Sequence, residues 1–185
     1  MPPNPPLDIE ILMERIRKDV AARRALAVPK SDVNKDQLYL TGTLLQFGKN
    51  KSVQPYLISG WADPEPGLQW TLGEVAEINF LFEKPPADLV LTFTAFPLIG
   101  GGITAQEVSA SWNGKLIGEW KITEGKSFHT LILSHIIANS ASGFLRFHLP
   151  TSFSPLSRNL SADPRRLGLN FQELVIRSAA ELGFQ

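Results

Sequence analysis

Apolar and polar residues alternate with a period of two along most of the chain from Gln37 onward. Such alternation is typical of half-buried β-strands, and Gly, Pro and Asn residues interrupt it where turns are expected. The pattern predicts about nine strands, at residues 37–47, 54–59, 74–82, 88–96, 107–112, 116–122, 127–133, 143–149 and 167–176. Short strands with one apolar face each favour a mainly β protein, an antiparallel β-sandwich.

Two of these segments indicate which side chains face the core. Within residues 74–82 the polar Glu77 and Asn79 fall on one face, and within 88–96 Thr92 and Thr94 do the same. The opposite faces are apolar and are expected to be buried. The predicted inward residues are Ala76, Ile78, Phe80, Phe82, Leu89, Leu91, Phe93 and Ala95.

Asn113-Gly114 lies between two alternating segments and is a strong β-hairpin signal. A two-residue turn would place Glu119 on the same face as Trp112, where the carboxylate would have to be buried. A three-residue loop with Gly114 in the left-handed conformation shifts the register by one residue. We therefore expect the three-residue loop, with Leu116, Trp120 and Ile122 on the face of Trp112.

Residues 1–29 have a different pattern: a proline-rich lead precedes a segment with helical periodicity. Its apolar residues are spaced by four, three and four positions, which makes one stripe: Ile9, Met13, Ile16 and Val20. Because the other faces are almost wholly charged, the amphipathic α-helix either docks on the domain's own core or binds a protein partner. Residues 30–36 read as a polar linker, and residues 37–180 as the β-sandwich domain.

Charge and composition exclude several classes of function. The chain carries 18 basic and 18 acidic residues, so no field of one sign attracts nucleic acid or an anionic membrane. No stretch approaches the ~18 apolar residues of a membrane span, and the N-terminus lacks the basic and apolar regions of a signal peptide. We expect a cytoplasmic protein with neither a nucleic-acid partner nor insertion into a membrane.

The catalytic inventory is small. There is no nucleophile elbow, zinc-protease motif, P-loop or dinucleotide-binding motif, and His129, His135 and His148 lack the spacing of metal ligands. Asp63 and Glu65 form a carboxylate pair in one Pro-rich turn, whereas glycoside hydrolysis needs two carboxyls across a cleft. A calcium ion there would lack enough fixed ligands. We expect a non-enzymatic protein with no cofactor and no assigned metal site.

Carbohydrate binding is the function that the aromatic residues could support. Sugars stack on exposed aromatic rings while neighbouring polar side chains bind their hydroxyls. Tryptophan in a β-sandwich is also commonly a core residue or covers one end of the core. The candidate contact residues are Tyr56, Trp61, Asp63, Glu65, Trp70, Trp112, Asn113 and Arg165.

The last loop before the final strand contains Asp163-Pro164-Arg165-Arg166. A carboxylate at this position can accept two parallel hydrogen bonds from an arginine and close the loop onto the sandwich. We therefore predict a structural role for Asp163.

Three segments carry a resemblance to a known family. The sequence GWADPE at residues 60–65, with Trp70 after it, resembles the opening of bacterial β-sandwich domains that accompany glycosyltransferases, phosphoglycerol transferases and other enzymes of surface polysaccharide. Asn113-Gly114 is similar to the family's central hairpin. The closing segment of the family is similar to Ser154, Pro155, Asp163, Arg165, Leu167 and Gly168.

This resemblance covers residues 59–176 and implies a jelly-roll or galactose-binding-like sandwich with an accessory, non-catalytic role. The chain departs from the family at residues 66–73, where a second aromatic residue and an acid are usual. Residues 12–24 also resemble the leader helices of bacterial polysaccharide-modifying proteins.

These features favour a non-enzymatic carbohydrate-recognition or scaffold module of surface polysaccharide, which finds a protein partner through its N-terminal helix. The alternative is a structural assembly subunit of a virion, tail or surface layer, whose helix and sheet edges contact proteins and bind no sugar. In that case the protein belongs to a virion or a cell surface. Self-association into a homo-oligomer is compatible with both hypotheses.

Deleting residues 1–28 should leave a folded sandwich but change the mass measured by light scattering or the proteins that co-purify. The reason is that the four-residue stripe contributes a few kcal/mol if it is fully covered by a partner. A truncated chain that unfolds would mean that the helix belongs to the domain's own core.

Overall fold

The computed structural model describes residues 38–183. The predicted N-terminal helix with Ile9, Met13, Ile16 and Val20, and the linker at 30–36, lie outside the described residues and stay predictions.

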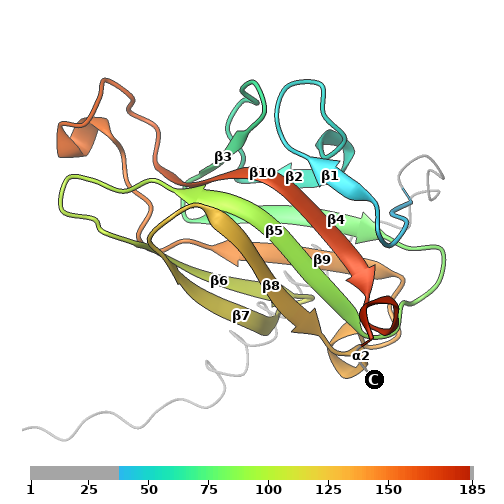
Figure 1. The fold of residues 1–185 in the computed structure, drawn as a ribbon. Helices are drawn as coiled ribbons and strands as arrows, with labels where there is room; N and C mark the ends of the chain where they lie inside the picture. The colour runs from blue at the N-terminus through green and yellow to red at the C-terminus, as the bar shows by residue number, and fades with distance from the viewer. Residues whose placement is uncertain (1–37, 184–185) are drawn as a thin grey trace, which may run out of the picture. The chain divides into compact units, whose positions relative to one another are not determined.

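The described chain forms two five-stranded antiparallel sheets, as the alternation predicted (Figure 1). The first sheet has the order β1-β10-β5-β8, with β3 also paired to β10, and the second has the order β2-β4-β9-β6-β7. The strands are β1 Leu44–Gln46, β2 Leu57–Ser59, β3 Gln69–Leu72, β4 Val75–Leu81, β5 Leu89–Pro97, β6 Gln106–Trp112, β7 Lys115–Ile122, β8 Lys126–Ile132, β9 Ser142–His148 and β10 Leu167–Ser178. Short helices connect them at η2 Gln54–Tyr56, α2 Ser134–Ile137, η3 Leu156–Arg158 and η4 Ala180–Leu182.

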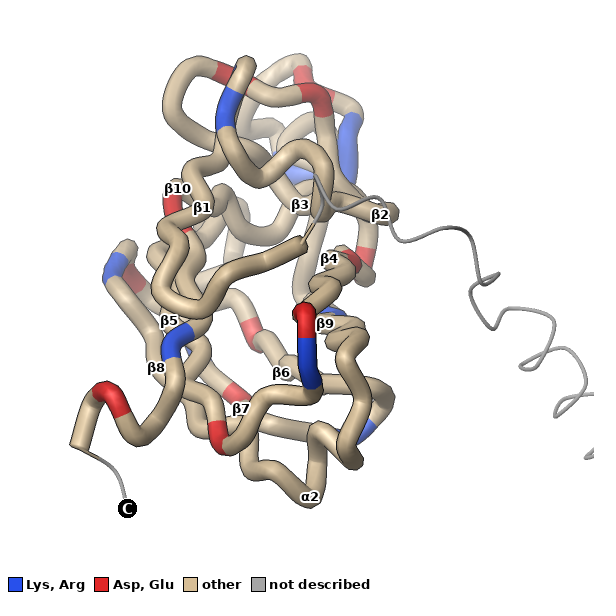
Figure 2. Tube along the Cα trace, turned by 90° about the vertical axis from the view of Figure 1, so that its right-hand side faces the viewer, with Lys and Arg blue, Asp and Glu red and all other residues tan. Residues whose placement is uncertain are grey.

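The core lies between the two sheets, and the predicted strand phases are confirmed. The buried residues of β4 and β5 include Ala76, Ile78, Phe80, Leu89, Leu91, Phe93 and Ala95, and Phe82 is buried directly after β4. Figure 2 shows acidic and basic residues interspersed along the described chain.

Three phenylalanines join the sheets at the centre of the core. Phe93 on β5 and Phe171 on β10 belong to the first sheet, and Phe147 on β9 belongs to the second. Their ring centroids are 5.0 to 5.5 Å apart, within the range of favourable aromatic pairs. These contacts pack the inner faces of the two sheets against each other.

β10 is the longest strand, and its apolar pattern changes phase once. Phe171 and Leu174 are both buried although three positions separate them, which strict alternation does not permit. The ladder with β5 shifts register here, and Gln172 is the extra residue of a β-bulge. The Gln172 carbonyl accepts a hydrogen bond from the Phe47 N–H at 2.8 Å. The bulge therefore keeps the apolar residues on one face and leaves Asn170 on the outer face.

The turn between β6 and β7 differs from the prediction. Trp112 pairs with Lys115, so Asn113 and Gly114 form a two-residue turn with positive φ angles of 49° and 81°. The predicted three-residue loop is therefore wrong. The extra residue lies within β7 instead, where Ile117 has no partner on β6.

Because of the bulge at Ile117, the part of β7 after it turns the predicted side chains toward the core. Beyond the bulge Ile122 is fully buried, and the half-buried Trp120 packs edge-on against Phe93, with ring centroids 5.2 Å apart. Leu116 lies before the bulge and is exposed, so its predicted inward position is wrong. Burial of the larger apolar groups, rather than the turn, determines where the register shifts.

A second hairpin, at residues 60–72, occupies the corner before β4. Glu65 and Leu68 exchange two backbone hydrogen bonds of 3.1 and 3.4 Å around Pro66-Gly67. Proline at the first central position and a positive φ of 75° at Gly67 are the features of a type II turn. The segment therefore forms the corner that leads into β4, and β3 is its second arm.

Glycine is required where this hairpin approaches β4. A Cβ atom on Gly60 would lie 1.7 Å from the Val75 carbonyl oxygen, so no larger residue fits. Gly60 also accepts a backbone hydrogen bond from the Leu72 N–H at 2.7 Å. This bond closes the base of the hairpin, and the backbone at Gly60 packs directly against that of β4.

Gly143→Ala should destabilise the protein by about 1–3 kcal/mol, the usual cost of overpacking a core. A Cβ atom on Gly143 would lie 1.9 Å from Cζ2 of the buried Trp112 ring, which cannot move away. Urea denaturation measures the effect. The double variant Gly143→Ala/Trp112→Phe removes the clashing ring atoms and should be less destabilised than the sum of the single variants. Additive losses would contradict this account.

Candidate functional site

Trp61 covers one end of the core. Its indole ring lies 5.2 Å from the Phe47 ring and 5.3 Å from the Phe171 ring, centroid to centroid. Its Nε1 donates a hydrogen bond to the Glu77 carbonyl at 3.0 Å. These contacts give Trp61 a packing role at the corner.

The fully buried Trp112 is not available as a sugar-stacking residue. Its ring is 0% exposed and stacks on Phe80 with 5.8 Å between centroids. The prediction of a ligand contact at Trp112 is therefore wrong, because burial between the sheets covers the indole.

Asn113 and Tyr56 are also engaged in the fold. The Asn113 amide donates to the Ser142 carbonyl at 3.2 Å and accepts from the Phe144 N–H at 2.8 Å, which ties the hairpin to β9. The half-buried Tyr56 stacks on Phe80 at 5.8 Å, and burial raises the pKa of its hydroxyl.

Trp70 is placed differently from the other three tryptophans. It lies on β3 between the buried Gln69 and Thr71, so its side chain is on the outer face of the first sheet. Trp70 is half-buried, and among the described residues it has no aromatic partner and no place in the core cluster. Of the four tryptophans, Trp70 is the one whose ring does not pack against the core.

Two further side chains extend from Trp70 across the same face. Trp70 is the direct partner of Asn170 on β10, and Asn170 is in turn the direct partner of Phe96 on β5. Residues opposite each other on neighbouring strands point to the same side of a sheet. We call these three residues the outer row.

The Asn170 amide at the centre of the outer row is not satisfied within the described chain. Its Oδ1 is buried and has no hydrogen-bond partner there. An unpaired buried acceptor costs about 1–3 kcal/mol, and because the protein covers this oxygen, an external donor reaches it only after the side chain rotates.

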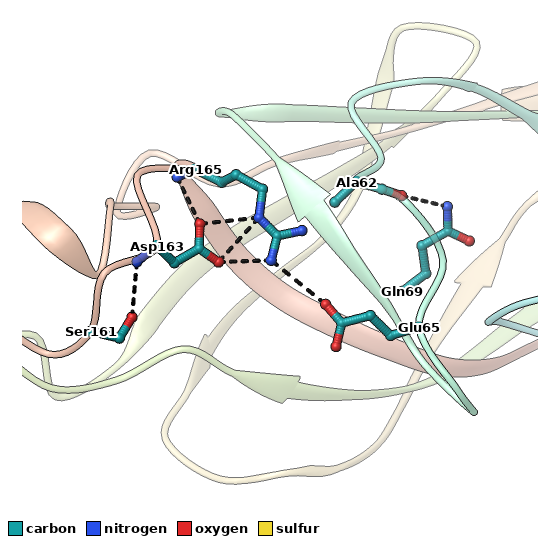
Figure 3. A network of polar contacts seen from close by, with 6 residues as sticks. All are labelled: Ala62, Glu65, Gln69, Ser161, Asp163 and Arg165. Atoms are coloured by element: carbon teal, nitrogen blue, oxygen red, sulfur yellow. Dashed lines mark hydrogen bonds and ion pairs between the residues drawn. The ribbon is translucent and has the colours of Figure 1, made fainter.

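The loop before β10 is closed by the predicted carboxylate–arginine pair (Figure 3). Asp163 accepts hydrogen bonds of 2.7 to 3.1 Å from the Arg165 Nη2 and Nε, and a further bond from the Arg165 N–H at 2.9 Å. These hydrogen bonds lower the pKa of the Asp163 carboxyl. The structural role predicted for Asp163 is confirmed.

Arg165 also connects this loop with the corner hairpin. Its Nη2 lies 3.6 Å from Glu65 Oε1, so the guanidinium is placed between two carboxylates (Figure 3). Two of the predicted contact residues, Glu65 and Arg165, are thereby brought together. Arg166 anchors the same loop separately, through Glu74 at 2.6 Å and the Ser152 carbonyl at 3.0 Å.

Asp63 is exposed, and it has no ion pair or side-chain hydrogen bond with another described residue. The hairpin around it is held from inside by the buried Gln69. The Gln69 amide donates to the Ala62 carbonyl at 2.8 Å and accepts from the Gln54 amide at 2.8 Å. The shape of the hairpin is thus set without Asp63.

Asn170 and Phe96 were missed by the sequence reasoning. Phe96 occupies the outward phase of its strand, where the preceding outward residues are Thr92 and Thr94. An aromatic residue among the outward, polar positions of a strand indicates a contact surface, and this pattern could have identified Phe96. Only the strand pairing, however, brings it beside Asn170 and Trp70.

The described residues contain neither a cluster of metal ligands nor a membrane-spanning helix. Within residues 38–183, no three His, Asp or Glu side chains converge as a metal site. His129 lies beside Thr92, with 2.9 Å between Nδ1 and the hydroxyl oxygen. No helix in this part of the chain is long and apolar enough to cross a membrane.

No protein-family model and no curated protein matches the chain. Solved structures with a similar fold include the C-terminal family 6 carbohydrate-binding module of LamC, a laminarinase from Zobellia galactanivorans, at 8% identity and a TM-score of 0.42 over 74% of this chain and 100% of that one. A family 35 carbohydrate-binding module from Clostridium thermocellum is 11% identical, with a TM-score of 0.39 over 75% and 100%.

An enzyme chain is also similar in part. A family GH115 4-O-methyl-α-glucuronidase with specificity for decorated arabinogalactans is 9% identical, with a TM-score of 0.42 over 76% of this chain and 18% of the enzyme. These likenesses are confined to the sandwich fold.

Asp163→Asn should lower the melting temperature at neutral pH, and the difference from the parent should shrink toward about pH 3. The pKa of Asp163 is lower in the folded chain than in the unfolded chain. The pair therefore stabilises the fold above the unfolded-state pKa, and this contribution is lost as pH falls through the folded-state pKa.

Thermal unfolding followed by circular dichroism measures this difference. Asp63→Asn is the matched control, because it removes an unpaired carboxylate nearby, and it should leave the melting temperature unchanged. A loss in Asp163→Asn that is equal at both ends of the pH range would contradict a contribution from charge.

Proposed function

We propose that the sandwich is a non-enzymatic carbohydrate-recognition module and that Trp70 is its main sugar contact. The observation that carries the proposal is the position of Trp70, on the outer face of the sheet and beside the half-buried amide side chain of Asn170. An aromatic ring binds the apolar face of a sugar, and an amide binds its hydroxyls. The Trp70 ring and the Asn170 amide, which provide these two kinds of contact, therefore lie on the adjacent strands β3 and β10.

The polar residues of the corner provide the surroundings of this contact. Glu65 and Arg165 are held by their ion pair, and Asp63 is free to accept a hydrogen bond from a hydroxyl. Stacking on one ring contributes about 0.5–1.5 kcal/mol beyond area burial, so a single contact gives dissociation constants in the millimolar range.

The carboxylates at this site support recognition rather than hydrolysis. A glycosidase acid must be protonated at neutral pH, which requires a raised pKa. The pKa of Asp163 is lowered, and Glu65 and Glu74 are paired with arginines. Asp163 therefore favours the ionised form, and all three carboxylates are suited to holding a loop through their arginine partners.

We extend the proposal to surface polysaccharide as the ligand class and to a protein partner bound through the N-terminal helix. Both rest on the resemblance of residues 60–65 and 12–24 to accessory domains and leader helices. The structural-subunit hypothesis, in which no sugar binds, is the alternative outcome of the test below.

Trp70→Ala should weaken the binding of glycans by at least about tenfold, since the stacking surface is removed. A glycan array finds the ligand, and an NMR titration with the best oligosaccharide then measures affinity. Trp70→Phe should keep part of the binding. Leu131→Ala, at another exposed apolar residue 41% exposed on β8, is the matched control and should bind like the parent.

Two results would overturn the proposal. One is a parent protein that binds no glycan on the array, and the other is a folded Trp70→Ala variant that binds as tightly as the parent. Either result would favour the structural assembly subunit.

A further inference from the structure

Phe96 lies at the far end of the outer row from Trp70. It is 37% exposed, which is unusual for a large aromatic side chain at the centre of a sheet. Its neighbour on β10, Asn170, separates it from Trp70 by two strand spacings.

The position of the Phe96 ring depends on a glycine. A Cβ atom on Gly125 would lie 1.8 Å from Phe96 Cδ1 and 2.1 Å from Cε1. The ring therefore rests directly on the backbone at Gly125, just before β8. Any larger residue at 125 would displace it.

The spacing of the outer row selects the length of the ligand. Neighbouring strands are about 4.8 Å apart, so the backbones at Trp70 and Phe96 are separated by roughly 10 Å across β10. The Phe96 ring rests on Gly125, on the β8 side of β5, and therefore lies farther still from Trp70. One pyranose ring does not reach both aromatic side chains. A ligand that contacts both must contain at least two sugar residues and must run across the strands.

The chemistry of the row also limits the charge of the ligand. Trp70, Asn170 and Phe96 are all uncharged, and the Arg165 guanidinium in the loop before β10 is already paired with Asp163 and Glu65. A carboxylate or sulfate held over the row would lose its hydration without gaining a cation.

We propose that the outer row binds an uncharged segment of two or more sugar residues, with Trp70 and Phe96 as its two stacking surfaces and the Asn170 amide bonding hydroxyls between them. This inference rests on the proposed function and adds the second ring, the length and the charge of the ligand. Asn170 lies between the two aromatic residues along the row, and rotation of its half-buried amide offers the unpartnered Oδ1 to a hydroxyl.

The test uses the full chain and a series of neutral cello-, xylo- and galacto-oligosaccharides of one to six units, with the corresponding uronic acid oligomers for comparison. Affinity of the parent should rise from one unit to the length that reaches both rings and then level off. Phe96→Ala should lower affinity for the longer oligomers by about threefold to tenfold and leave the affinity for the monosaccharide unchanged.

Gly125→Ala is the second variant, because it keeps the phenyl ring but displaces it. It should reduce affinity for the longer oligomers in the same way as Phe96→Ala. Leu131→Ala is again the control, and melting temperatures show whether each variant is folded.

The outcomes separate this inference from the proposed function. If Trp70→Ala loses binding while Phe96→Ala and Gly125→Ala do not, the recognition function stands and the second ring is wrong. Equal losses for the monosaccharide and the longer oligomers, or tighter binding of uronic acid oligomers, would also overturn the inference. No binding at any length would overturn both.

Discussion

The hydrogen-bond ladder of β10 is the constraint on which the rest of the structure depends. This strand pairs with β1, β3 and β5, so its register decides which side chains of the whole first sheet are buried. The bulge at Gln172 allows Phe171 and Leu174 to reach the core together. A register without the bulge would bury either Glu173 or Asn170 against apolar neighbours, at a cost of several kcal/mol.

Much of the sandwich could be predicted because burial alone determines it. The alternation in β4 and β5 identified the core residues, since a period of two leaves no choice about which face is apolar. The Asp163 and Arg165 pair could also be predicted, because the two residues are close in sequence and their geometry is complementary. In both cases the evidence was local to one segment.

The remaining features depend on which strands become neighbours. The bulge at Ile117 was not visible in the turn sequence, because Asn113-Gly114 keeps its favoured two-residue turn and the register shifts only within β7, where the shift brings Trp120 and Ile122 against the core. Exposure of the tryptophans could not be assigned either: Trp112 and Trp70 have similar sequence surroundings, but one lies between the sheets and the other on the outside. Asn170 and Phe96 join Trp70 only through pairings between segments distant in the sequence.

The corner hairpin is attached to the sandwich through the backbone ladder of β3 with β10, through the Trp61 indole bonded to the Glu77 carbonyl, and through the buried amide of Gln69, which accepts from Gln54. None of its exposed side chains takes part in that attachment except Glu65 through its ion pair. Asp63 can therefore be exchanged with little effect on folding. Sequence variation at this position would change the surroundings of Trp70 without a penalty in stability, so this corner is well suited to evolve, or to be engineered, toward new ligand specificities.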